Sequence, residues 1–477
     1  MFRNATLFDL KRISANPVFC DPALWIFPGH HNNIHPNPET LTMKRITTFI
    51  VVALYLALAS SVFAQKDSIR WTPGRCIQYA INHSSNINII ESVLRTDSLM
   101  VLQAKAERFP NISAGSDYNY SWVSSTSNST SSNTENISAS VSANLTLFNG
   151  HQISLNIRRN LLQMASDSMN LEYNYLILAE NIVTYYLQSL YSLEELKINE
   201  EQLQLATEQT KIAETKLELQ DIIRTDYLQI AADEANNNLQ LVQAQNQFNS
   251  SRLNLNKLMQ LSTDSVVLLI PPEEWHTQTN QSVNSFDSIW QLALNSRPEL
   301  KMAQINIGIK EQDLAISKAN RLPNLSARVS SGWNQDLLST TATGRINASA
   351  GLSLTIPIFN NKQTSTNIAL SKIYLENEKT SYESSVYNLK ISIVELIQDI
   401  VASQAELESA SVQLNLAIES YNAALESFSI GKLQTIELLM QKTQLNTARH
   451  NVLKAKYNLI LSEIILQLYT NSWTFIN

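Results

Sequence analysis

The chain has 477 residues, of which 44% are apolar and only 16% are charged, and its formal net charge at pH 7 is −7. A typical soluble domain is about one quarter charged, so uncharged polar residues fill the difference here. The negative balance argues against a nucleic acid as partner, because binding to phosphates needs an excess of Lys and Arg. Only Cys76 lies outside the N-terminal segment discussed next, so no intrachain disulfide is expected.

A secretory signal is expected near the N-terminus. Two basic residues precede an apolar run, Ile46–Leu58, and small residues suited to signal cleavage follow it. The run is shorter than the roughly 18–20 apolar residues of a transmembrane helix. Because a signal peptide stands at the start of a chain, we expect residues 1–42 to be an upstream extension from a mis-called start codon. Residues 43–64 are then the signal peptide.

The rest of the chain consists of two copies of one unit. The motif RFPNIS recurs 213 residues later as RLPNLS, and LFNG recurs 211 residues later as IFNN. The copies therefore differ in length only between these two motifs. Self-similarity at this scale predicts a first repeat over 65–270 and a second over 271–477.

Each repeat contains two stretches in which every second residue is apolar, as in NISASVSANLTLFNG, where the alternation runs from Ile137 to Leu147. Period-two alternation predicts β-strands with one apolar and one polar face. The expected strands span about residues 111–123, 136–148, 325–335 and 345–358. Their length of about ten residues matches a tilted transmembrane strand.

The polar faces of these strands favour a membrane over a soluble sandwich. A sandwich would carry Lys and Glu on its wet faces, whereas here Ser, Asn and Thr predominate, as in a water-filled lumen. Four strands cannot close a barrel, and lipid does not tolerate an open sheet edge. Three copies would supply twelve strands, an even number within the known range.

Long helices are expected around the strands. No proline falls between Pro110 and Pro271, and none follows Pro357. A 4-3-4-3 spacing typical of coiled coils runs from Leu178 to Leu217 and again 211 residues later. A helix over 152–219 would be about 100 Å long. A helix over Pro73–Phe109 and a helix that ends near Met259 would each be about half as long.

Together these motifs resemble the TolC family of outer-membrane efflux proteins, from Trp71 to about Thr470. The second copy matches best, with LTIPIFNN and the helix-turn-helix SFSIGKLQTIELLMQ. A glycine usual in the family is Gln220 here. The resemblance implies a mostly α protein with a membrane β-barrel portion. Two tandem helix–hairpin–helix repeats form, as a homotrimer, a 12-stranded outer-membrane β-barrel on a long α-helical periplasmic tunnel.

The resemblance also implies a function and partners. The protein would be the outer-membrane exit duct of a tripartite efflux or type I secretion system, in contact with outer-membrane lipid and extending into the periplasm. It would dock to a periplasmic adaptor and an inner-membrane pump, and conduct small molecules or exported polypeptide passively. The alternative is a non-conducting, structural coiled-coil protein that spans the periplasm.

Two sets of residues are candidates for function. At the turns between long helices, Asp226 and Glu437 are repeat equivalents at the start of the returning helices. They would either cap these helices or, in the family's closed periplasmic end, ring an aperture. Gly431 suits a left-handed turn there, and Arg224 would pair with Asp221 or Asp226. An aromatic girdle at the membrane surface is expected from Tyr118, Tyr120, Trp122 and Trp333.

The sequence predicts no enzyme. It contains no nucleophile elbow, no glycine-rich phosphate loop and no clustered Cys and His with the spacing of metal ligands. We therefore expect no catalytic residue, no metal and no cofactor.

Overall fold

The computed structural model describes residues 70–123, 132–262, 267–272, 285–338 and 344–470. All of them lie in the part of the chain from Ser68 to Asn477. The predicted upstream extension and the predicted signal peptide fall outside the described residues, and so does most of the loop between the first two strands.

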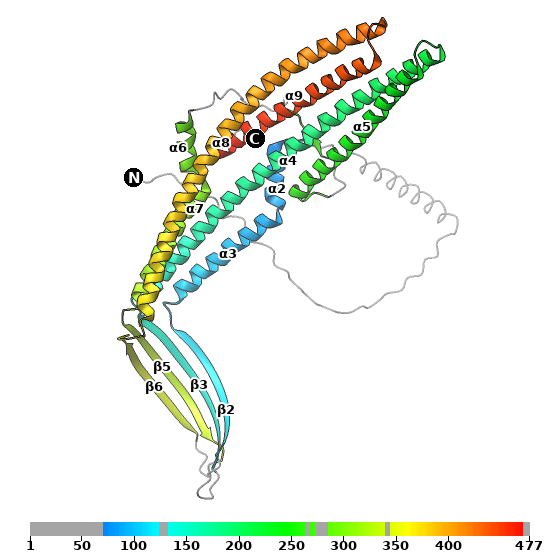
Figure 1. Cartoon of the computed structure of the whole chain (residues 1–477). Coiled ribbons are helices and arrows are strands. Elements are labelled where there is room, and N and C mark those ends of the chain that lie inside the picture. Colours follow the sequence, from blue (N-terminus) through cyan, green and yellow to red (C-terminus); the bar gives the residue numbers. More distant parts are fainter. Residues whose placement is uncertain (1–69, 124–131, 263–266, 273–284, 339–343, 471–477) are drawn as a thin grey trace, which may run out of the picture. The chain divides into compact units, whose positions relative to one another are not determined.

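The described elements follow the order helix, hairpin, helix twice (Figure 1). The first repeat contains α2 (Pro73–His83), α3 (Ser85–Ala106), β2 (Asn111–Val123), β3 (Ser132–Phe148), α4 (Gln152–Glu218) and α5 (Arg224–Met259). The second contains α6 (Phe286–Ser296), α7 (Pro298–Ala319), β5 (Asn324–Asp336), β6 (Arg345–Thr355), α8 (Gln363–Ser429) and α9 (Thr435–Tyr469). Two short parallel strands pair with each other, β1 (Arg70–Trp71) and β4 (Leu268–Leu269).

The expectation of one helix over Pro73–Phe109 is wrong, because the helix is interrupted at Ser84. This residue is extended, with φ −66° and ψ 118°, and its hydroxyl accepts a hydrogen bond from the Ile87 N–H. It thus caps the N-terminus of α3. The equivalent position in the second repeat is Arg297, which is also extended. Pro298 follows it, and a proline disfavours helical geometry in the residue before it.

Two long helices organise the packing. The shorter helices α3 and α5 both pack along α4, and α7 and α9 both pack along α8. Helix α7 also contacts α4 and so joins the two repeats. Within the described ranges, no helix combines the length and the apolar character needed to cross a membrane.

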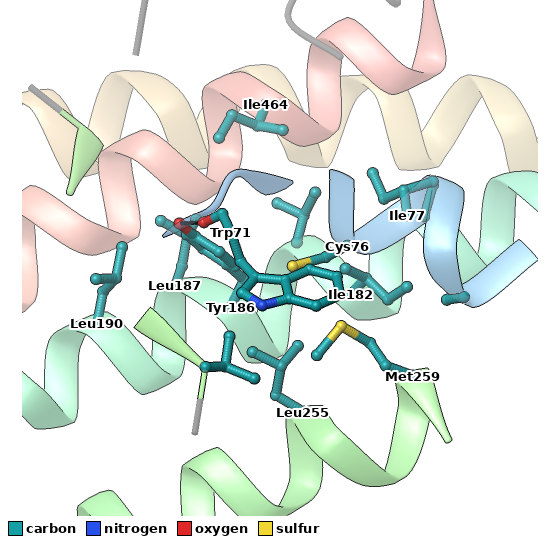
Figure 2. Close-up of a cluster of buried hydrophobic side chains, with 14 of the residues drawn as sticks. Trp71, Cys76, Ile77, Ile182, Tyr186, Leu187, Leu190, Leu255, Met259 and Ile464 are labelled. Carbon is teal, nitrogen blue, oxygen red and sulfur yellow. Dashed lines mark hydrogen bonds between the residues drawn. The ribbon is translucent and has the colours of Figure 1, made fainter. Parts of the chain in front are cut away.

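The largest buried cluster joins the middle of α4 to its neighbours (Figure 2). Tyr186 on α4 is fully buried, and its hydroxyl donates to the carbonyl oxygen of Trp71 at 2.7 Å. Cys76, Leu255 and Met259 lie around it and are also completely buried. Burial raises the pKa of the Cys76 thiol to about 12, so this cysteine is a core residue with an unreactive thiol.

The four longer strands form one antiparallel sheet in the order β2-β3-β5-β6. Strand β6 ends at Thr355, three residues before the predicted end. Its last partner is Asn324, the first residue of β5, so the chain beyond Thr355 has no residue of β5 to pair with. Pro357 also lacks the N–H that would extend the ladder.

A buried ion pair connects the two helical hairpins. The Lys442 Nζ on α9 lies 2.7 Å from a carboxylate oxygen of Asp233 on α5, and 3.2 Å from the side-chain oxygen of Gln209 on α4. The Lys442 side chain is only 6% exposed. The single positive charge of Lys442 balances the single negative charge of Asp233, so the pair links the two repeats without a net charge.

We expect the two strand-to-helix turns to respond differently to alanine. Gly150 has φ +66°, and a Cβ there would lie 2.9 Å from the Ala319 carbonyl oxygen. Gly150→Ala should therefore lower the stability by about 2 kcal/mol or more, from left-handed strain and steric overlap. The repeat equivalent, Asn361, already carries a side chain at φ +51°, so Asn361→Ala should cost less than about 1 kcal/mol. Thermal unfolding followed by circular dichroism measures both, and equal losses would contradict this account.

Removing one member of the buried pair should cost more than removing both. Lys442→Met leaves the Asp233 carboxylate without its cation and should lower stability by about 3 kcal/mol. The double variant Lys442→Met/Asp233→Leu should regain most of that loss, because it leaves no unpaired charge. The same unfolding measurement tests this prediction. If the loss of stability in the double variant equals the sum of the losses in the two single variants, the two side chains act independently.

Candidate functional site

The two hairpin tips have the same backbone design and lie at the end of the helices away from the sheet (Figure 1). Gln220 and Gly431, one repeat apart, are both left-handed, with φ +60° and +73°. The next N–H reaches back five residues in each tip, from Asp221 to Lys216 at 2.8 Å and from Lys432 to Ser427 at 2.9 Å. This is the Schellman ending of a helix, which glycine favours. The left-handed turn expected at Gly431 is present, and Gln220 adopts it without glycine.

Asp226 and Glu437 both lie three residues after the N-cap of their helices. Glu437 completes a capping box: its carboxylate accepts from the backbone N–H of Gln434 at 3.4 Å, while the Gln434 side chain accepts from the N–H of Glu437. The equivalent N-cap in α5 is Ile223, which has no side-chain acceptor. Asp226 therefore complements the positive end of the helix dipole without a capping box.

The ion pair expected for Arg224 is not formed. It is exposed, and no ion pair joins it to Asp221 or Asp226 among the residues that the structure describes. Its guanidinium is at the first position of α5, where the helix dipole disfavours a cation.

Each tip exposes two large aliphatic side chains among its polar residues. Leu219 and its repeat equivalent Ile430 are 74% and 61% exposed, and Ile223 and Ile436 beside them are 65% and 47% exposed. Large aliphatic groups grouped at one end of a molecule are typical of an interaction surface.

The register of the sheet places the four alternating patterns on common faces. One row across all four strands consists of Ile112, Ala143, Val329 and Ala350. Other members of this apolar face are strongly exposed, with Ile346 at 80%, Leu352 at 72% and Val141 at 52%. No helix of the described chain packs against the sheet closely enough to cover it.

The opposite face of the sheet is polar and hydrogen-bonded. Its next row consists of Ser113, Ser142, Ser330 and Ser349. The hydroxyls of Ser113 and Ser142 are 3.1 Å apart, and those of Ser330 and Ser349 are 2.8 Å apart. The sheet is thus amphipathic across its full width, and its polar face carries mostly small neutral groups together with the charged Asp117 and Arg328.

The four aromatic residues lie on the apolar face, towards the loop end of the hairpins. Tyr118, Tyr120 and Trp122 follow one another along β2 and are 62%, 55% and 64% exposed. Trp333 on β5 is 37% exposed and stands opposite Ala139 and Ile346.

Sequence reasoning missed the link between Lys442 and Asp233. The two residues are not repeat equivalents, so the offset of 211 does not pair them. One signal was present: Lys442 stands in the buried stripe of α9 between Leu438 and Leu445. A cation in such a stripe needs a buried partner.

The comparisons with known proteins agree with these features. The family described as "Outer membrane efflux protein" matches residues 94–259 and 289–472. No curated protein sequence matches the chain significantly.

Several solved structures share the fold. A membrane protein from Pseudomonas aeruginosa superimposes with a TM-score of 0.72 at 13% identity, over 83% of this chain and 92% of its own. The outer membrane protein VceC from Vibrio cholerae gives 0.70 at 12% identity, over 83% and 95%. The CmeC outer membrane channel from Campylobacter jejuni gives 0.66 at 15% identity, over 83% and 85%. With most of both repeats matched by the family, the chain belongs to the outer membrane efflux proteins.

Proposed function

We propose that three copies of this chain form a passive exit duct, with a twelve-stranded barrel in the outer membrane and a helical tunnel in the periplasm. The observation that carries the proposal is the amphipathic sheet, in which apolar side chains predominate on one face and Ser, Asn and Thr on the other, with Asp117 and Arg328 among them. Such a sheet suits lipid outside and water inside.

The trimer follows from the edges of the sheet. Strands β2 and β6 each have one partner and leave the other side of the backbone unpaired within the chain. In lipid each unsatisfied N–H or C=O costs several kcal/mol, so the edges need further strands. Pairing β6 of one copy with β2 of the next closes a barrel when three copies assemble. Tyr118, Tyr120, Trp122 and Trp333 then form its aromatic girdle.

The helices complete the duct on the periplasmic side. Helices α4 and α8, at 67 residues each, are about 100 Å long. Their tips, with the exposed aliphatic residues described above, would dock a periplasmic adaptor that connects an inner-membrane pump. In this arrangement no enzymatic step takes place in the duct, and the pump selects the cargo.

Single-channel recording tests conduction directly. The purified protein, reconstituted in a planar bilayer, should give discrete steps of ionic current, because the polar face of the sheet lines a water-filled lumen. A protein that inserts into the bilayer as a trimer but carries no current would favour the structural alternative, a coiled-coil spacer.

The same recordings test whether the tip carboxylates ring the aperture. Glu437→Gln combined with Asp226→Asn removes six charges from a trimer. Gln at the third helical position preserves the capping box. The preference for cations should therefore fall, with a shift of the reversal potential towards zero in a salt gradient, because a narrow mouth responds strongly to fixed charge.

A control separates this role from helix capping. Asp399→Asn and Glu406→Gln also remove six charges per trimer, but from the body of α8, away from the tips. The control should leave the reversal potential closer to that of the unaltered protein. If the tip variant keeps the original reversal potential at unchanged stability, Asp226 and Glu437 serve only their helices.

A further inference from the structure

A cavity of about 220 Å³ lies between the two helical hairpins, close to their tips. All four long elements contribute to its wall, with Ile212 and Lys216 from α4, Ile230 from α5, Phe428 from α8 and Leu438 and Leu439 from α9. Most of this wall is aliphatic or aromatic. The cavity is therefore an apolar space that both repeats enclose.

The size of the cavity limits what it holds. An apolar cavity of about 150 Å³ binds benzene. A cavity of about 220 Å³ therefore has room for a ligand with one phenyl ring and a short side chain, or for an alkyl chain of similar volume.

One cation in the wall is not neutralised. The Lys216 Nζ is 5.9 Å from the centroid of the Phe428 ring, and the side chain is half-buried. Within the described part of the chain, Lys216 forms no ion pair, whereas Lys442 nearby is neutralised by Asp233. The repeat equivalent of Lys216 is Ser427, so the second repeat supplies no such cation. An apolar cavity with one free ammonium at its wall is complementary to an amphipathic monoanion.

We propose that this cavity binds a small aryl or alkyl carboxylate. The apolar body lies between Phe428 and Leu438, and the carboxylate accepts a hydrogen bond from the Lys216 ammonium. Because both hairpins form the wall, an occupant stabilises the relative position of the hairpins that encloses it. The ligand therefore acts on the arrangement of the tips as well as filling a pocket.

Binding is tested on the full chain as a trimer in lipid nanodiscs, with 3-phenylpropionate as the probe. Saturation-transfer NMR should show saturable binding with a dissociation constant on the order of 1 mM, as expected for a ligand of this size. Empty nanodiscs correct for partition into lipid. The neutral analogue 3-phenylpropionamide reports on the apolar part of the site alone.

Two variants and a control locate the site. Lys216→Gln should weaken binding of the acid about tenfold and leave the amide unchanged, because only the acid uses the charge. Lys211→Gln, five residues earlier on the exposed surface of α4, should bind both compounds as the unaltered protein does. Ala213→Leu, which fills the cavity from its buried wall, should abolish binding of both.

The proposal is overturned if the unaltered protein shows no saturable binding beyond the empty nanodiscs. It is equally overturned if Lys216→Gln binds the acid as tightly as Lys211→Gln does. If Ala213→Leu does not assemble, the contrast between acid and amide in Lys216→Gln still decides.

The effect on conduction rests on the proposed function and is measured separately. Saturating 3-phenylpropionate should change the open probability of the reconstituted protein, and should leave that of Lys216→Gln unchanged at the same concentration. A protein that binds the acid but carries no current would refute the duct and leave the binding site intact. If the protein conducts but its open probability does not change when the acid binds, the proposed coupling between the cavity and the tips is refuted.

Discussion

Lipid offers no hydrogen-bond partner to a peptide group, and this constraint governs the rest of the molecule. The sheet has an apolar face that no helix of the described chain covers, which suits lipid, but its two edge strands lack partners on one side. Only further strands can satisfy them, and copies of the same chain are the simplest source. In the proposed duct, the closed barrel and the common lumen follow from that requirement, and three copies supply twelve strands.

The arrangement of the helices follows from the sequence repeat. Each copy carries one long helix with two shorter helices packed along it, so both repeats can build the same wall. The two repeats differ in individual side-chain contacts. The capping box with Glu437 has no counterpart at Asp226, and the Lys442–Asp233 pair is formed only once. The hairpins are thus similar in geometry but held by unequal contacts.

Much of this fold is accessible from sequence because its elements are long and strongly periodic. The alternation from Ile137 to Leu147 identifies β3, which the structure extends to Ser132, and the helix expected over 152–219 agrees with α4 to within one residue. The repeat offset alone pairs Asp226 with Glu437 and predicts equivalent turns.

The remainder depends on contacts that no local pattern encodes. The break at Ser84 depends on one hydroxyl that caps a helix, in a stretch whose composition permits continuous helix. The partner of Lys442 lies on another helix, 209 residues earlier, so only the fold brings the two together. Proximity in sequence predicts a carboxylate partner for Arg224, but among the described residues it forms no ion pair with Asp221 or Asp226. Spacing predicts which elements form, and packing decides which side chains meet.

The most direct test of the central claim is the environment of the two sheet faces. Single cysteines in a Cys76→Ser background, placed in turn at residues 137–145 of β3 and spin-labelled, report access to oxygen from lipid and to a water-soluble nickel complex. The reconstituted trimer should show a period of two, with Val141 accessible to oxygen and Ser142 accessible to nickel. Equal accessibility at the two positions, or the reverse pattern, would contradict a sheet with lipid on one face and a lumen on the other.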